Sequence, residues 1–350
     1  MIARIDALTS AAADHGASDL FLSADEPPRL RVAGGIATMG DAVVPAAVVE
    51  DFWRACGADP ARSCDHDTSY VDAKGHRFRV NLYRHLGRIA AVLRHIKRHV
   101  AGLEELGLPA TLLRDWVSRP SGLVLVTGAT GCGMSTTLAS CLDWLNHHAD
   151  RHIVTIEDPV EYLFAAEVSF FSQREVYTDT ASFAQGLRSA LRQSPDVIFV
   201  GEIRDSETAT TALQAAETGH LVLSTLHSAS VTDTLERLTH LFPPAERESA
   251  LLLLSSQLIG ILSQKLLAGP DDTLHVVVEH LQNEGATREW VRRTKLPEIA
   301  DFLRRGESPA NRSFLTSLVE ATESGLLTAE TAAEASLTPN DFYRALRGIR

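Results

Sequence analysis

The stretch LVLVTGATGCGMS, residues 123–135, joins a short apolar run to a glycine-rich loop, and residues 136–145 behind it are helix-like. This strand–loop–helix order is the context in which a phosphate-binding P-loop forms. Gly128, Gly131 and Gly133 allow backbone conformations that turn consecutive N–H groups inward, and the following helix adds the positive end of its dipole. The sequence therefore predicts a nucleotide site formed by Gly128, Ala129, Thr130, Gly131, Cys132, Gly133, Met134, Ser135 and Thr136.

Met134 stands where such a loop needs a lysine that reaches the β- and γ-phosphates. No Lys or Arg occurs between Ser121 and Ser140, so nothing in the local sequence compensates. A charge-assisted contact to phosphate is usually worth ~1.5–3 kcal/mol, and it counts for more where charge develops during phosphoryl transfer. We therefore expect the backbone amides to bind ATP while turnover suffers. Ser135 is expected to supply the hydroxyl that holds Mg²⁺.

Outside this loop, short continuous apolar runs alternate with helix-like stretches, which predicts an α/β fold with a mostly parallel sheet buried on both faces. The runs are residues 123–127, 153–156, 197–200 and 221–225. The helix-like stretches between them include residues 136–145, 183–192 and 207–218. Beyond Pro243–Pro244 the pattern is mostly helical, apart from the strand-like LHVVV at residues 274–278.

Polar residues follow three of these predicted strands at their carboxyl ends, the edge where ligands bind in open α/β sheets. Glu157 and Asp158 follow the second run, Glu202 the third and His227 the fourth. A carboxylate at this edge can orient the attacking water or Mg²⁺-bound waters, and a histidine can sense the γ-phosphate. Asp196 begins the strand that Glu202 follows, and extended chain separates the two by about 20 Å. We therefore exclude Asp196 as a magnesium ligand.

Length and pattern together predict two domains. Residues 1–98 mix helix and strand signals and are expected to form a small α+β domain. Residues 99–110 are expected to link it to the P-loop domain, residues 111–350, which ends in helices.

Composition narrows the class of protein. The 350 residues have a net charge of −12 and a mean hydropathy of −0.02, typical of a globular chain. The acidic balance argues against a duplex DNA binder, because DNA affinity comes mainly from neutralised phosphates. The four cysteines form no CxxC array, and neither a signal peptide nor an uninterrupted apolar span is evident, so a reducing cytoplasm is expected.

Together these stretches resemble the secretion-ATPase superfamily, and most closely the type IV pilus twitching-motility (retraction) ATPases, over nearly the whole chain. GATGCGMSTT is similar to the P-loop of that family, and its other motifs occur in the family's order. They are ASDLFLS (residues 17–23), RFRVN (77–81), TIEDPVEY (155–162) as the Asp box, SALRQSPDVIFVGEIRD (189–205) as the Walker B segment and AAETGHLVLSTLH (215–227) as the His box.

The resemblance implies a RecA-like P-loop domain behind a PAS-like α+β domain, assembled into a homo- or hetero-hexamer that uses ATP and Mg²⁺. It makes Glu202 and Glu157 the catalytic residues. It implies that arginines arrive from an N-terminal domain, and the candidates for phosphate sensors or arginine fingers are His227, His220, Arg77, Arg79 and Arg94. The implied setting is cytoplasmic, at the inner-membrane base of a pilus or secretion machine, with a membrane platform protein as partner and no DNA.

Two departures from the family pattern keep alternatives open. Met134 favours an impaired pseudo-ATPase, a structural or regulatory subunit that joins a ring with an intact paralogous ATPase; the retained glutamates oppose it. The retraction branch's C-terminal motif is present only as EIADFLRR, residues 298–305, which leaves the direction of the motor open. The absence of a four-cysteine zinc motif keeps the retraction branch ahead of the extension branch. A RecA-like nucleic-acid motor is disfavoured by the acidic balance.

Overall fold

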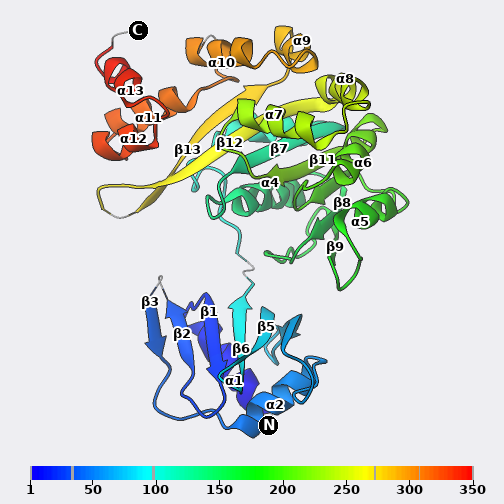
Figure 1. Ribbon diagram of the computed structural model, residues 1–350, viewed down its shortest axis with the longest axis vertical. Helices are drawn as coiled ribbons and strands as arrows, with labels where there is room; N and C mark the ends of the chain where they lie inside the picture. Colours follow the sequence, from blue (N-terminus) through cyan, green and yellow to red (C-terminus); the bar gives the residue numbers. More distant parts are fainter. Residues whose placement is uncertain (1, 33–34, 97–98, 272, 307, 349–350) are drawn as a thin grey trace. The chain divides into compact units, whose positions relative to one another are not determined.

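A computed structural model of the chain describes residues 2–32, 35–96, 99–271, 273–306 and 308–348 (Figure 1). Contacts within the backbone divide the chain into two compact units. One comprises Met1–His99 with Glu161–Leu163, and the other comprises Val100–Val160 with Phe164–Arg350.

The N-terminal unit is a six-stranded antiparallel sheet covered by two helices, with the strand order β3-β2-β1-β6-β5-β4. Alternate residues of β5, including Phe78 and Val80, are fully buried in a core with Phe52 and Trp53 of α2. The elements are α1 (Ile2–Asp14), β1 (Asp19–Ser23), β2 (Arg29–Val32), β3 (Gly35–Thr38), α2 (Ala46–Ala55), β4 (Asp65–Val71), β5 (Arg77–His85) and β6 (Arg88–His95).

The second unit is built on a seven-stranded sheet in the order β13-β12-β7-β11-β10-β8-β9 (Figure 1). Six neighbouring strands are parallel, and β13 is antiparallel to β12 at one edge. The strands are β7 (Gly122–Gly128), β8 (His152–Glu157), β9 (Phe170–Glu175), β10 (Val197–Val200), β11 (Leu221–Leu226), β12 (Leu258–Ala268) and β13 (Leu274–Gln282). The predicted α/β class with a mostly parallel sheet is confirmed.

Helices cover both faces of this sheet. Successive side chains of a strand point to opposite faces, so a strand that is apolar throughout must be covered on both. Leu123 and Leu125 of β7 belong to one apolar cluster, and Val124 and Val126 belong to the other. The helices are α3 (Ala110–Ser118), α4 (Met134–His148), α5 (Phe183–Ala190), α6 (Ser206–Glu217), α7 (Val231–Leu241), α8 (Arg247–Gln257), α9 (Ala286–Arg292), α10 (Leu296–Arg305), α11 (Phe314–Glu323), α12 (Ala329–Ala335) and α13 (Pro339–Leu346).

The expectation that the chain beyond residue 243 is mostly helical is wrong for the strand that pairs with the P-loop strand. Residues 258–268 form β12, which pairs with β7 on one side and β13 on the other. A strand buried on both faces is a continuous apolar run, which periodicity alone cannot distinguish from a buried helix. Among the described residues, no helix combines the length and the apolar character that crossing a membrane requires.

Candidate nucleotide-binding site

The P-loop connects the end of β7 to the start of α4, as the sequence predicts. Gly133 precedes the helix with φ of 91°, a left-handed conformation that side chains other than glycine rarely adopt. A Cβ atom on Gly128 would lie 2.6 Å from the carbonyl oxygen of Gln264, so this position requires glycine for close approach of β12. The Cys132 N–H donates to the Ala129 carbonyl at 3.1 Å and closes a turn inside the loop.

Met134, the residue at the lysine position, is 8% exposed and belongs to an apolar cluster that includes Val126 and Leu138. Its side chain therefore contributes to the packing between β7 and α4 and brings no charge to the loop. Cys132 belongs to the same cluster, and burial raises the pKa of its thiol. Ser135 is partly exposed in the first turn of α4.

The shape of the loop fits a phosphate group. The first N–H groups of a helix have no partner within the helix, and here they belong to the first turn of α4. On the loop, a Cβ atom at Gly131 would meet nothing within 4 Å among the described residues, so this side of the loop is open. The hydroxyl of Ser135 and the carboxylates at the strand ends are hard oxygen donors of the kind that Mg²⁺ prefers. The described residues contain no group of three His, Cys, Asp or Glu side chains that could hold a metal ion.

The carboxyl ends of four parallel strands meet at this edge of the sheet. Thr127 pairs with Leu226 across β7 and β11, and Val200 pairs with both Ser224 and Ile156 across β10 and its neighbours. Gly128, His227 and Glu157 directly follow Thr127, Leu226 and Ile156, and Glu202 stands two residues after Val200. The parallel register therefore brings the loop, the histidine and both glutamates to a single edge.

Glu157 ends β8 and is 6% exposed. The Thr155 hydroxyl donates to its Oε1 at 2.7 Å, and the Gln173 amide donates to the same oxygen at 3.4 Å. Both of these bonds reach the same carboxylate oxygen, so they favour one orientation of the side chain.

Glu202 lies between a histidine and an arginine. Its Oε1 is 3.6 Å from Nε2 of His227, and its Oε2 accepts a hydrogen bond from Nε of Arg204 at 2.6 Å. The Arg204 guanidinium is also 3.7 Å from Oδ2 of Asp158. The carboxylate of Glu202 is the main cause of a raised pKa of Arg204. Sequence reasoning did not single out Arg204, although it stands two residues after Glu202 in the GEIRD motif.

His220 lies at the other end of β11 from His227. Its Nδ1 is 2.9 Å from the carbonyl oxygen of Ala215 at the end of α6, and its own carbonyl accepts from the N–H of Gly122. The strand between the two histidines spans about 20 Å. Within one subunit, the structure does not bring His220 to the P-loop. Asp196 is at this same amino end, where its Oδ2 accepts from the His152 N–H at 2.8 Å.

The three candidate arginines lie on the N-terminal unit. Arg77 and Arg79 alternate with the buried Phe78 and Val80 on β5, so they share the face opposite the core. Arg94 on β6 pairs in register with Arg79, and its Nε donates to Oδ1 of Asp19 at 2.8 Å. The Arg94 side chain remains 67% exposed.

Behind the loop lies a row of polar side chains that the sequence analysis did not identify. Ser263, Thr127 and Thr234 are buried, and Ser228 at its end is half-buried. Its distances are 2.7 Å from Ser263 Oγ to Thr127 Oγ1, 3.2 Å from Thr127 Oγ1 to Thr234 Oγ1, and 2.5 Å from Thr234 Oγ1 to Ser228 Oγ. Gln264, next to Ser263 on β12, bonds to the loop itself. Two of these residues are on β12, which the periodicity assigned to a helix, so no signal placed them near the loop.

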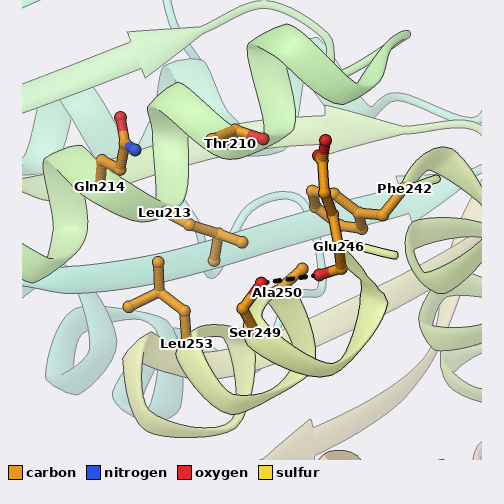
Figure 2. A pocket seen from close by; sticks show the side chains of 8 residues that line it. All are labelled: Thr210, Leu213, Gln214, Phe242, Glu246, Ser249, Ala250 and Leu253. Atoms are coloured by element: carbon orange, nitrogen blue, oxygen red, sulfur yellow. Dashed lines mark hydrogen bonds between the residues drawn. The ribbon is translucent and has the colours of Figure 1, made fainter. Parts of the chain in front are cut away.

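A surface pocket between α6 and α8 contains none of the predicted site residues (Figure 2). In it the Ser249 hydroxyl donates to the Glu246 carbonyl at 2.8 Å, within the first turn of α8. Its lining residues are Thr210, Leu213, Gln214, Phe242, Glu246, Ser249, Ala250 and Leu253. It is therefore separate from the nucleotide site.

Comparison with known proteins places this geometry in a family. The family model described as "Type II/IV secretion system protein" matches residues 69–304. The type IV pilus retractation ATPase PilT of Pseudomonas aeruginosa is 38% identical over 344 residues, which are 97% of this chain and 99% of the relative. An uncharacterized Escherichia coli protein, YggR, is 40% identical over 298 residues, which are 84% of this chain and 90% of the relative.

Solved structures agree with these matches. The crystal structure of the pilus retraction motor PilT with bound ADP superposes with a TM-score of 0.89 at 38% identity and covers 97% of this chain and 99% of that one. The Legionella pneumophila ATPase DotB has a TM-score of 0.76 at 26% identity, over 94% of both chains. The chain therefore belongs to the type II/IV secretion system protein family.

Proposed function

We propose that this chain is an ATP-driven motor subunit of a type IV pilus that acts in pilus retraction. The observation that carries the proposal is the meeting of a P-loop, two glutamates and a histidine at one sheet edge, in a chain that is similar over 97% of its length to a pilus retraction ATPase. The retained Glu202 and Glu157 favour hydrolysis over nucleotide binding alone.

In the proposed mechanism the residues of this chain have separate tasks. The amides of residues 128–136 would bind the phosphates, and the Ser135 hydroxyl would hold Mg²⁺, whose charge would neutralise that of the phosphates. Glu202 orients the attacking water and accepts its proton, assisted by Glu157. His227 follows β11, the neighbour of the P-loop strand β7, and its Nε2 is 3.6 Å from Oε1 of Glu202. This position supports a role for His227 as the sensor that reports the γ-phosphate to the carboxylate.

The assembly proposed here is a hexameric ring of one or two kinds of subunit. Arg77, Arg79 and Arg94 would stabilise phosphate charge on a neighbouring subunit, and His220 is a candidate only for such a contact between subunits. The ring would act at the cytoplasmic base of the pilus on an inner-membrane platform protein, and a paralogous ATPase would be the second subunit of a mixed ring.

Met134 is the observation that favours the alternative, a subunit that binds nucleotide without turnover; the relatives give that alternative no support. The test is Met134→Lys, which restores a cation to the loop. We expect wild-type protein to bind ADP and ATP, and the lysine variant to hydrolyse ATP about 10-fold faster or more, because one charge-assisted phosphate contact is regained.

Met134→Leu is the matched control, because it keeps an apolar side chain in the cluster with Val126 and Leu138 and adds no charge. It should hydrolyse ATP no faster than wild type. Wild-type turnover equal to that of the lysine variant would remove the pseudo-ATPase alternative. No nucleotide binding by either protein would refute the proposed function itself.

A further inference from the structure

We propose that Gln264 is a positioning residue for the P-loop, which sets the direction of a phosphate-binding N–H through the carbonyl of Cys132. This inference rests on the proposed nucleotide site. Gln264 lies on β12, outside every motif that the sequence suggested, and it contacts the loop from behind.

The side-chain amide of Gln264 forms two hydrogen bonds with the loop and its helix. Its Nε2 donates to the Cys132 carbonyl at 2.5 Å, and its Oε1 accepts from the Thr137 hydroxyl at 2.9 Å. Gln264 and Thr137 are both 2% exposed. A buried amide of this kind stays in place because each unmade hydrogen bond would cost its full desolvation. Gln264 therefore ties the middle of the loop to the first turns of α4.

The bond to Cys132 has a consequence for the next residue. The peptide group is planar, and the Cys132–Gly133 bond is trans, so its C=O and N–H point in opposite directions. Because the carbonyl points toward Gln264, the Gly133 N–H must point away from β12. Gly133 is the residue immediately before α4, where N–H groups directed outward bind phosphate. Gln264 thus fixes the orientation of this donor before any ligand arrives.

Close packing beneath the loop supports the same role. Gly128 pairs in register with Gln264, and a Cβ atom on Gly128 would lie 2.6 Å from the Gln264 carbonyl. A Cβ atom on Gly133 would lie 3.3 Å from Nε2 of Gln264. Two of the loop glycines therefore leave space for this one residue. Loss of the amide would leave the Cys132 carbonyl without its partner and the loop free to turn.

The residue before Gln264 on β12 links the loop to the histidine edge. This residue, Ser263, begins the row of polar side chains that continues through Thr127 and Thr234 to the half-buried Ser228. Ser228 directly follows His227, and Thr127 directly precedes Gly128. The loop and the histidine are therefore held by adjacent residues of one strand, so that their spacing is fixed. With Met134 in place of a lysine, the orientation of the amides is the main means by which the loop binds phosphate.

The experiment measures Mg·ADP and Mg·ATP binding by calorimetry for wild type, Gln264→Leu and Gln264→Glu, with thermal unfolding of each protein. Gln282→Leu is the matched control, because Gln282 on the adjacent β13 also has a side-chain hydrogen bond, from Trp116 Nε1 at 3.0 Å, but lies outside the loop. We expect Gln264→Leu to bind ADP about 10-fold more weakly or worse, and Gln282→Leu to bind it as wild type does.

Gln264→Glu supplies a readout that a purely structural role would not change. A protonated carboxyl can donate to the Cys132 carbonyl and accept from Thr137, as the amide does, whereas a carboxylate can only accept. The ratio of the variant's ADP dissociation constant to that of wild type should therefore fall as pH is lowered from 8 to about 5. Binding is compared at a temperature at which all the proteins are folded.

Three results would each overturn the inference. The first is an ADP affinity of Gln264→Leu equal to that of wild type, and the second is a parallel loss of affinity in both leucine variants with equal losses of thermal stability. A pH-independent ratio for Gln264→Glu would equally contradict it. Wild-type protein that binds neither nucleotide would refute the proposed function and this inference together, so the two failures are distinguishable.

Discussion

At the scale of the residue, the burial of His280 predicts how the stability of the fold depends on pH. It is 2% exposed on β13, its Nδ1 lies 3.0 Å from the Ala310 carbonyl, and burial lowers its pKa to about 4. In the unfolded chain the imidazole takes up a proton near pH 6.5. The unfolded state therefore binds more protons between these values, and stability must fall as pH drops below about 6.5.

We expect this residue to cost about 2 kcal/mol of unfolding free energy between pH 7 and pH 5. His280→Asn keeps a donor for the Ala310 carbonyl but has no charge to gain, so its stability should depend less on pH. Urea unfolding at both pH values measures the difference. Equal losses in wild type and variant would show that His280 is not a source of the acid sensitivity.

Site residues that follow an apolar run in the sequence could be predicted. Site residues that are defined only by their tertiary contacts could not. The P-loop positions, Glu157, Glu202 and His227 each follow an apolar run, so their common edge could be inferred before any coordinates. The pairing of Arg204 with Glu202 and Asp158 depends on side-chain directions that no pattern encodes. The contact of Gln264 with the loop could not be predicted at all, because its strand was assigned to a helix.

At the scale of the element, that error has a physical cause. Leu251, Leu254, Leu258 and Ile261 recur at helical spacing across the end of α8 and the start of β12. Gln257 ends the helix and Leu258 begins the strand, with no glycine or proline between them to mark the change. β12 lies between β7 and β13 with apolar layers on both faces, so it lacks the alternation of a half-buried strand.

Helix α10 allows a prediction about stability. It contains EIADFLRR, and its Ile299 and Leu303 are 0% and 2% exposed, one turn apart on the face that packs into the core. Leu303→Ala should reduce the free energy of unfolding by about 2–5 kcal/mol, because a buried cavity forms. Asp301→Ala, on the exposed side of the same helix, should change it by about 0.5 kcal/mol or less. Denaturant unfolding compares the two; similar losses would show that α10 does not pack as described.

At the scale of the whole molecule, the sequence predicted two different kinds of unit because each has its own core and its own periodicity. The antiparallel sheet alternates buried and exposed residues, whereas the parallel strands are buried throughout. Contacts between subunits of the proposed ring follow from neither pattern, since the residues proposed to make them are exposed in the single chain. Arg79 and Arg94 are two of these proposed residues, both on the solvent-facing side of the N-terminal sheet.

A mixed ring would test whether these arginines act on a neighbouring subunit. The design combines Arg79→Ala subunits with Glu202→Gln subunits, in a Met134→Lys background if the natural loop turns over too slowly to measure. Each variant alone should show little ATP hydrolysis, since every site lacks either the arginine or the carboxylate. In a random equal mixture, about a quarter of the interfaces join an intact arginine to an intact Glu202, so activity should recover to roughly that fraction.

Arg29→Ala is the control for charge, because Arg29 is an exposed arginine on β2 of the same sheet. It should retain activity alone and need no partner. If Arg79 acted on the glutamate of its own subunit, no mixture could restore a complete site, and activity would stay at the level of the separate variants. Recovery of activity in the Arg79 mixture, together with full activity of Arg29→Ala alone, would show that the complete site forms only in the assembled ring. One subunit would then supply the P-loop and the carboxylates, and its neighbour would supply the guanidinium.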